Sequence, residues 1–216
     1  EQVYGTGFIA ELGLAWNQAL ANGLLARWHL DGVSNQQRFF NHAVAPLLAK
    51  NSDRRVFVII SDAFRYEAAR ELTEQLNGRY RIDARLSVQL GVLPSYTGLG
   101  MAALLPHRTL AYDAGGGLRV DGQPCGALEQ RGKVLAAVQG VAVKADAFMA
   151  MKKDEGRAFV KPYRVVYLYH DPVDAIGDKP ATEAQTFQAV RQAIDELADL
   201  TLKIINSLNG SQVLIT

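Results

Sequence analysis

The sequence predicts an α/β protein with a mainly parallel sheet and helices on both of its faces, preceded by an N-terminal helical segment. Residues 56–60 form a continuous β-branched and aromatic run, as expected of a parallel strand that is buried on both faces. Residues 164–169 indicate a second buried strand. Helical periodicity follows each strand, over residues 63–77 and 181–208, and strands that alternate with helices favour this architecture.

The chain is expected to divide near residue 50. Residues 1–50 are predicted to form a helical segment that leads into, or packs on, an α/β domain at 51–216. Apolar side chains recur at helical spacing over residues 7–29, and Asp31-Gly32 separates this helix from a second one. Trp16 and Trp28 are expected to anchor this segment in the core.

The remaining elements follow from shorter patterns. A strand is predicted at 80–90, a helix at 98–105 and a final strand at 212–215. Residues 110–113 and 118–120 flank Gly115-Gly116-Gly117 and predict a hairpin, because this triplet lacks the Lys-Ser/Thr end of a phosphate-binding loop. Residues 126–151 are predicted to be mostly helical.

Composition excludes several classes of protein. The net charge is +1, from 23 basic and 22 acidic residues, so no overall basic field indicates autonomous nucleic-acid binding. Cys125 is the only cysteine, which excludes an intrachain disulfide and fits a reducing compartment. No apolar run approaches the roughly 20 residues that span a bilayer, and the first residues lack signal-peptide features. We therefore expect a cytoplasmic protein without membrane association.

Chemically active side chains follow the two buried strands. Asp62 ends the first strand, and Pro94-Ser95-Tyr96-Thr97 forms a turn that places a hydroxyl at the start of a helix. Because ligands collect beyond the carboxyl ends of strands in α/β sheets, this acid and this hydroxyl indicate a metal-assisted nucleophile that acts on phosphate. The alternative is that Asp62 and Thr97 only cap helices. An acidic segment after the second strand is either a metal site or a solvated turn: His170, Asp171, Asp174 and Asp178.

These motifs resemble a known family. Their order is similar to the alkaline phosphatase superfamily, whose phosphodiesterase branches place a nucleophilic Thr three residues after a Pro, as Thr97 follows Pro94. Segments 60–67, 93–106 and 170–179 look like the PglZ domain of bacterial BREX phage-defence systems, and the resemblance covers roughly residues 50–216. It implies a truncated alkaline-phosphatase-like fold, because the family places an Ala-Asp-His-Gly segment with further metal ligands after a strand like 213–216. The chain is therefore expected to be a fragment.

The resemblance also implies roles for individual residues. Asp62 would bind one of two divalent ions, and Thr97 would be both a metal ligand and the nucleophile. Asp174 matches the acid that binds the second ion. Asp178 stands where many members have His, so that either Asp178 or His170 would complete this ligand set. Zinc is the expected ion, with manganese and magnesium as alternatives.

Two further residues are candidates for binding substrate. The backbone N–H of Gly98 would receive a phosphate oxygen at the start of the helix. Arg65 follows Asp62 by one helical turn and is a candidate for substrate contact, the alternative being a surface ion pair with Glu67 or Glu71.

Three classes of function remain. The first is a metal-dependent phosphohydrolase, phosphodiesterase- or nuclease-like, acting on phosphoesters such as nucleic acid in phage defence, although this fragment itself is not expected to be fully active. A sulfatase is disfavoured, because residues 94–106 lack a Cys or Ser that leads a Pro-x-Arg motif. The second class is a non-catalytic scaffold or regulatory subunit that binds other BREX proteins, such as the defence methyltransferase. The third is an α/β module that binds one divalent ion through Asp62 without turnover.

Overall fold

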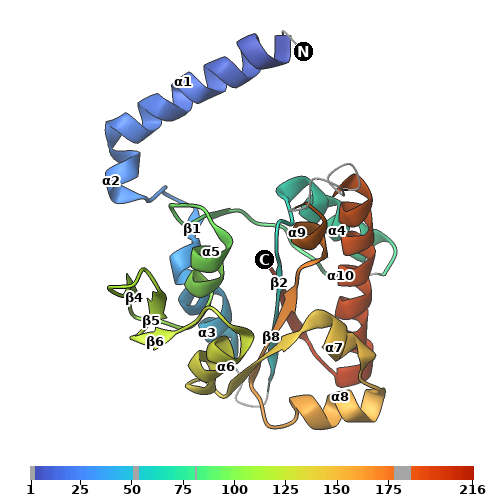
Figure 1. Ribbon diagram of the computed structural model, residues 1–216. Helices are drawn as coiled ribbons and strands as arrows, with labels where there is room; N and C mark the ends of the chain where they lie inside the picture. Colours follow the sequence, from blue (N-terminus) through green and yellow to red (C-terminus); the bar gives the residue numbers. More distant parts are fainter. Residues whose placement is uncertain (1–2, 51–53, 81, 178–185) are drawn as a thin grey trace.

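Four parallel strands form the central sheet of the computed structural model, which describes residues 3–50, 54–80, 82–177 and 186–216. The sheet confirms the predicted α/β architecture (Figure 1). Its spatial order is β7 (Gly140–Lys144), β8 (Val165–His170), β2 (Val56–Ser61) and β9 (Gln212–Ile215). Every residue of β2 and β8 is buried, as the continuous apolar runs predicted.

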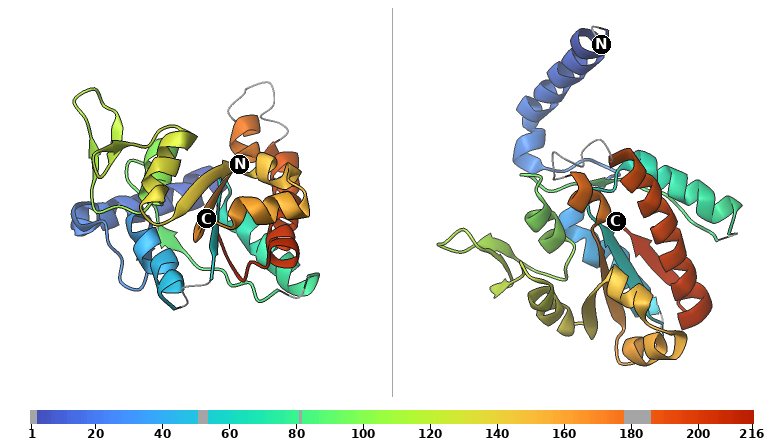
Figure 2. Two further views of the ribbon diagram at one scale, coloured as in Figure 1. Left: turned by 90° about the horizontal axis from the view of Figure 1, so that it is seen from below. Right: turned by 45° about the vertical axis from the view of Figure 1, so that its right-hand side comes forward.

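Helices cover both faces of the sheet, because successive strand side chains point to opposite sides. Val56, Val58 and Ile60 of β2 face one cluster, and Phe57 and Ile59 face the other. Figures 1 and 2 show the two helical layers on either side of the strands. The first layer holds η4 (Phe40–Val44), α3 (Ala45–Lys50), α5 (Thr97–Ala103) and α6 (Leu128–Ala136); the second holds α4 (Tyr66–Gly78), α7 (Ala145–Ala150), α8 (Lys153–Val160) and α10 (Thr186–Leu208).

The N-terminal helical segment stands away from the body of the protein (Figures 1 and 2). It comprises η1 (Val3–Ile9), α1 (Ala10–Ala19), η2 (Leu20–Leu24) and α2 (Leu25–Arg27). Trp16 is 45% exposed and packs edge-on against Trp28, with ring centroids 6.4 Å apart. The expectation that Trp16 anchors a core is therefore wrong. Trp28 does attach to the body, since its indole donates a hydrogen bond to the Gly91 carbonyl oxygen at 2.7 Å.

Smaller elements connect the layers. The predicted hairpin is confirmed by β4 (Leu110–Tyr112) and β5 (Leu118–Val120), which pair antiparallel and are extended by β6 (Gln123–Pro124). The remaining pieces are β1 (Ser34–Asn35), η3 (Gln36–Arg38), β3 (Gln89–Leu90) and α9 (Pro172–Gly177). Within the described residues, no helix is both long and apolar enough to cross a membrane.

Two of the predicted secondary-structure elements also differ from the structure. The strand predicted at 80–90 is reduced to β3, which pairs with β1 in a separate two-stranded sheet and not with the main one. The mostly helical prediction for 126–151 missed β7, which lies at the edge of the main sheet and is half-buried over much of its length. A short edge strand has too little alternation to stand out between two helices.

Candidate functional site

The carboxyl ends of three strands meet at one edge of the sheet. The Asp62 N–H donates to the His170 carbonyl oxygen at 2.9 Å, which continues the β2–β8 ladder by one residue. On the other side of β2, the Ser61 N–H donates to the Thr216 carbonyl oxygen, also at 2.9 Å. α9 lies at this same edge (Figure 1). The fold thus brings together the two strand ends at which the sequence placed its acidic residues.

Asp62 occupies a tight turn beyond β2. Its Oδ1 accepts a hydrogen bond of 3.0 Å from the Ala63 N–H, and Ala63 has a left-handed φ of 58°. Burial raises the pKa of the Asp62 carboxyl above its usual value, and the negative charges of Asp174 and Asp171 raise it further. The Ala63 N–H and the Arg131 guanidinium act in the opposite direction. Asp62 and Asp174 therefore lie close enough to repel each other.

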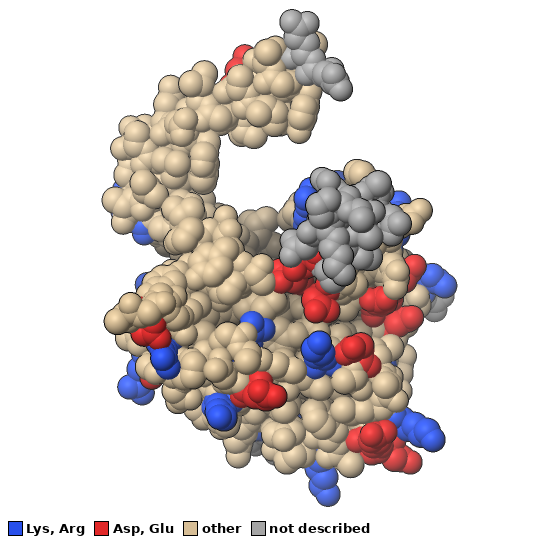
Figure 3. Space-filling view, viewed as in Figure 1, with Lys and Arg blue, Asp and Glu red and all other residues tan. Residues whose placement is uncertain are grey.

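The carboxylates at this edge are suitable ligands for a divalent cation, but they do not form a complete ligand set. Asp174 lies in the first turn of α9, and Figure 3 shows acidic side chains gathered over this region. Carboxylate oxygens are the donors that hard and borderline divalent ions take, and a cation would relieve the repulsion at Asp62. Among the described residues, no group of three or more His, Cys, Asp or Glu side chains is arranged to hold a metal ion. Asp178 lies outside the described residues.

His170 points away from this carboxylate pair. Its Nδ1 lies 2.8 Å from Ser61 Oγ, and its Nε2 lies 3.0 Å from Glu196 Oε2 on α10. Asp62 follows Ser61, so strand alternation places the Asp62 carboxylate on the other face of the sheet, the face covered by α5 and α6. Both imidazole nitrogens thus have protein partners. Metal ligation by His170 stays a prediction, and it would require one of these contacts to break.

Thr97 and Gly98 begin helix α5 on the same face of the sheet as Asp62. The Thr97 side chain is exposed, whereas Leu99 is buried with Val92 and Ala103 and fixes the helix to the body. The Gln36 side chain joins the segment before α5 to the helix itself. Its Oε1 accepts a hydrogen bond from the Val92 N–H at 3.0 Å, and its Nε2 donates one to the Gly100 carbonyl oxygen at 3.2 Å. The hydroxyl therefore sits on a firmly attached helix start. The structure gives no contact between Thr97 and Asp62 that would test their pairing.

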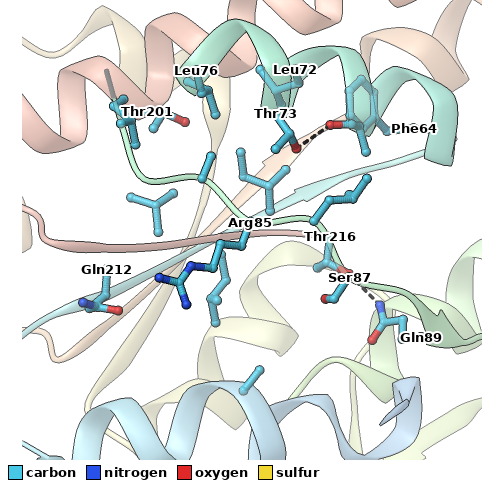
Figure 4. Close-up of a pocket in the computed structure, with 18 of the residues that line it drawn as sticks. Phe64, Leu72, Thr73, Leu76, Arg85, Ser87, Gln89, Thr201, Gln212 and Thr216 are labelled. Carbon is cyan, nitrogen blue, oxygen red and sulfur yellow. Dashed lines mark hydrogen bonds between the residues drawn. The ribbon is translucent and has the colours of Figure 1, made fainter. Parts of the chain in front are cut away.

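Arg65 lies at the start of α4 and lines a different cavity. This cavity has a volume of about 1090 Å³ and lies between α4, residues 82–89 and β9 (Figure 4). In Figure 4 the side chains of Thr216 and Gln89 meet through a hydrogen bond of 2.8 Å at one end of it. Asp62, Thr97 and His170 are not among the described residues that line it. Glu71, an expected alternative partner of Arg65, instead pairs with Arg191.

Three residues around the strand ends could not be identified from the sequence. Ser61 directly precedes Asp62, yet a serine at a strand end gives no signal of a buried contact. Glu196 and Arg131 reach the site from α10 and α6, far away in the sequence. No local pattern in the sequence indicates either residue, because their roles depend on how the helices pack on the sheet.

A parallel sheet flanked by helices, with aspartates gathered at its carboxyl edge, defines an α/β protein of the alkaline-phosphatase-like class. Residues 39–216 match the family described as the BREX system PglZ alkaline phosphatase-like domain, and the chain belongs to this family.

Two curated relatives match over the whole chain. The chain is 44% identical over 219 residues to "Alkaline phosphatase-like protein BrxZ" of Escherichia coli O9:H4 (strain HS). It is 34% identical over 218 residues to "Alkaline phosphatase-like protein PglZ" of Bacillus cereus (strain H3081.97). The match covers 100% of this chain but only 25% of each relative, so the chain spans a quarter of their length. No solved structure matches significantly.

Proposed function

We propose that this chain carries part of the centre of a metal-dependent phosphohydrolase of BREX phage defence, acting on phosphodiesters such as nucleic acid. The observation that carries the proposal is the convergence of Asp62 and Asp174 at the carboxyl edge of the sheet, where the charge of Asp174 helps to raise the pKa of Asp62. Membership of an alkaline phosphatase-like family supports the same reading.

The carboxylates are the proposed metal ligands. Asp62 would hold one divalent ion and Asp174 the second, with zinc expected and manganese or magnesium as alternatives. Such an ion supplies charge neutralisation at the phosphate and lowers the pKa of a bound hydroxyl. Asp178 remains a proposed ligand of the second ion. His170 joins it in this proposal only if its contact with Ser61 or Glu196 is exchanged for the ion.

Thr97 is the proposed nucleophile. Its Oγ1 would form a bond to phosphorus while the bond from phosphorus to the leaving oxygen breaks, and the leaving oxygen would take up a proton. Water would then hydrolyse the bond between phosphorus and Thr97 Oγ1, which releases a phosphate monoester and restores the Thr97 hydroxyl. The Gly98 N–H, at the start of α5, would donate to a phosphate oxygen. Arg65 would contact only a substrate long enough to extend to the cavity beside β9, as nucleic acid is.

The test is hydrolysis of an aryl phosphodiester by a version of the chain extended beyond Thr216, with each divalent ion in turn. Thr97→Ala is expected to abolish metal-dependent turnover, and Thr97→Ser to retain part of it. The exposed Thr109→Ala serves as the matched control. Equal turnover by the wild-type and Thr97→Ala proteins would exclude Thr97 as nucleophile. If the extended protein folds but shows no turnover with any ion, the result would favour a non-catalytic scaffold that binds other BREX proteins.

A scaffold that binds other BREX proteins is the second candidate. The N-terminal segment favours it, because several large apolar side chains there are exposed without neighbours from the body: Val3 (87%), Tyr4 (65%), Phe8 (61%), Leu12 (54%) and Leu14 (64%). This segment lies outside the matched domain. The defence methyltransferase is the proposed partner. Co-elution with it that Leu12→Glu abolishes and Thr97→Ala leaves intact would support this role, and equal elution of both variants would contradict it.

A further inference from the structure

Two exposed tyrosines lie beside the proposed nucleophile. Tyr96 directly precedes Thr97, and Tyr112 is the last residue of β4 in the hairpin. Their hydroxyl oxygens lie 2.7 Å apart, within hydrogen-bonding distance, although Tyr96 is 45% exposed and Tyr112 is 51% exposed. Because the two hydroxyls bond to each other at a position where water is also at hand, the tips of the two rings are joined at a defined place on the surface.

The Tyr96 ring packs over the first turn of α5. A Cβ added at Gly98 would lie 2.9 Å from Tyr96 Cε2 and 3.5 Å from Cδ2, so a residue larger than glycine would push the ring aside. The backbone is fixed as well, because the Tyr96 carbonyl oxygen accepts a hydrogen bond from the Gly100 N–H at 3.0 Å. The ring therefore lies against the same helical turn that carries Thr97.

The hairpin directs Tyr112 towards this helix. Leu110 of β4 and Leu118 of β5 pack against the buried residues of α5, next to which the hairpin lies (Figure 1). Alternate side chains of a strand share a face, so Tyr112, two residues after Leu110, lies on the side of the hairpin that meets α5. The turn beyond it is held by Asp113, whose Oδ1 accepts from the Gly117 N–H at 2.8 Å. Both tyrosines thus stand on attached backbone.

The two rings form a neutral aromatic surface. Within the described part of the chain, no other aromatic ring and no cationic side chain stacks on either of them. The hydrogen bond with Tyr112 raises the pKa of Tyr96, so the Tyr96 hydroxyl keeps its proton at neutral pH and adds no negative charge beside an anionic substrate. Such a surface suits a planar aromatic group that the substrate carries.

An unpaired nucleobase fits this surface better than a base pair does. Every base has a flat face that stacks on an aromatic side chain with little regard to sequence. Bases inside a duplex are already stacked on one another and are not free to do so. The net charge of +1 also provides no overall basic field for the backbone of a duplex, so that stacking has to supply much of the binding.

We propose that Tyr96 and Tyr112 form a stacking platform for an unpaired base next to the phosphodiester that Thr97 attacks, so that the substrate is single-stranded nucleic acid. The inference rests on the proposed function for the bond that is cleaved, whereas the binding of bases does not depend on turnover. It makes the two tyrosines residues that determine specificity, while Thr97 and the aspartates carry out the chemistry.

The first experiment measures binding without turnover. An end-labelled oligothymidylate of about 10 nucleotides is titrated with the chain in the presence of a chelator and followed by fluorescence anisotropy. Tyr96→Leu and Tyr112→Leu should each weaken binding about tenfold, the loss expected for one contact between a base and an aromatic ring. Tyr96→Phe and Tyr112→Phe keep the ring faces and should bind within about twofold of the wild type. Leu25→Ala in α2, with a side chain that is 56% exposed but not aromatic, should leave binding unchanged.

A second measurement detects stacking directly. The ring signals of ¹³C-labelled tyrosine are followed by NMR during the same titration, and the two Phe variants assign them. We expect the signals of Tyr96 and Tyr112 to move to high field, because a stacked base shields the ring beneath it. Gly98→Ala, which pushes the Tyr96 ring aside, should reduce the shift at Tyr96.

The outcomes separate this inference from the proposed function. Oligonucleotide binding that depends on both rings, in a protein whose extended form shows no turnover, would support the platform and remove the hydrolase. Thr97-dependent hydrolysis of the aryl phosphodiester, with no oligonucleotide binding or with binding that neither Leu substitution weakens, would overturn the platform and leave the hydrolase standing. Duplex DNA that binds as tightly as the single strand would also overturn the platform. If both Leu variants fail to fold by circular dichroism, unshifted ring signals in the wild-type titration overturn the inference on their own.

Discussion

Ser61 and His170 join the ends of two neighbouring strands, with Ser61 Oγ 2.8 Å from His170 Nδ1. Both side chains are buried, and the other ring nitrogen lies 3.0 Å from Glu196. Because an ionised carboxylate only accepts hydrogen bonds, the tautomer that fits both contacts donates from His170 Nε2 to Glu196 and accepts from the Ser61 hydroxyl at Nδ1. The contact thereby ties β2, β8 and α10 together just beneath Asp62.

Removing the Ser61 hydroxyl is expected to destabilise the fold. Ser61→Ala leaves His170 Nδ1 buried without its donor, which costs about 1–3 kcal/mol of unfolding free energy. Urea denaturation followed by circular dichroism measures the change. Ser87→Ala, at an exposed position, should change the free energy by less than about 0.5 kcal/mol. Equal effects of the two substitutions would contradict the role given to Ser61.

Asp62→Asn is expected to stabilise the protein near neutral pH. Burial and then the charge of Asp174 raise the folded-state pKa of Asp62 above its usual 3.8, so ionising Asp62 opposes folding. Protonated Asp62 makes its full contribution to stability below pH 3.8. This contribution is lost as the pH rises through the raised pKa of the folded state. The gain from Asn should therefore be largest at pH 7 and shrink towards pH 4.

Denaturation midpoints of both proteins between pH 7 and pH 4 measure this dependence. Asp146→Asn, at an exposed position in the first turn of α7, provides the control. If the stability difference between Asp62→Asn and the wild type did not change with pH, the pKa of Asp62 would not be raised by its surroundings.

Ala63→Gly is expected to stabilise the turn after Asp62. Ala63 has a φ of 58°, a left-handed conformation that costs an L-residue about 1–2 kcal/mol and glycine little. After the greater chain entropy of glycine in the unfolded state is subtracted, a net gain of about 1 kcal/mol remains. Thermal denaturation checks this. Ala158→Gly, within α8, should instead destabilise by about 1 kcal/mol.

Gly210→Ala is expected to destabilise the connection between α10 and β9. A Cβ at this position would lie 2.9 Å from Phe57 Cε2 and closer still to Ile204 Cγ2, both in the core. Such overpacking typically costs about 1–3 kcal/mol. In Gly78→Ala a Cβ meets no atom within 4 Å, so this variant should retain wild-type stability in the same urea titration. A neutral Gly210→Ala would mean that the Ile204 side chain can move aside.

Much of the fold could be predicted from local patterns. The runs at 56–60 and 164–169 are apolar enough to be buried on both faces, and they form β2 and β8. The glycine triplet at 115–117 predicted the hairpin, because it lies between two short strand-like segments and lacks the Lys-Ser/Thr end of a phosphate-binding loop. β7 was missed, since edge strands are partly exposed and resemble their helical surroundings.

The candidate site could be predicted only in part. Asp62 stood out because it directly follows a buried strand, and Thr97 because it follows a proline turn. Arg131 and Glu196 gave no such signal. Their side chains reach the sheet edge only after α6 and α10 have packed on opposite faces.

The sequence by itself therefore determined the elements, the parallel sheet and the edge at which the acidic residues collect, because hydrophobic periodicity and strand polarity are local properties. Only the tertiary structure decided which face each side chain occupies. Strand alternation turns His170 towards Glu196 and Asp62 towards Arg131, although the sequence placed both at strand ends. That separation arises from the register between β2 and β8, which no local pattern encodes.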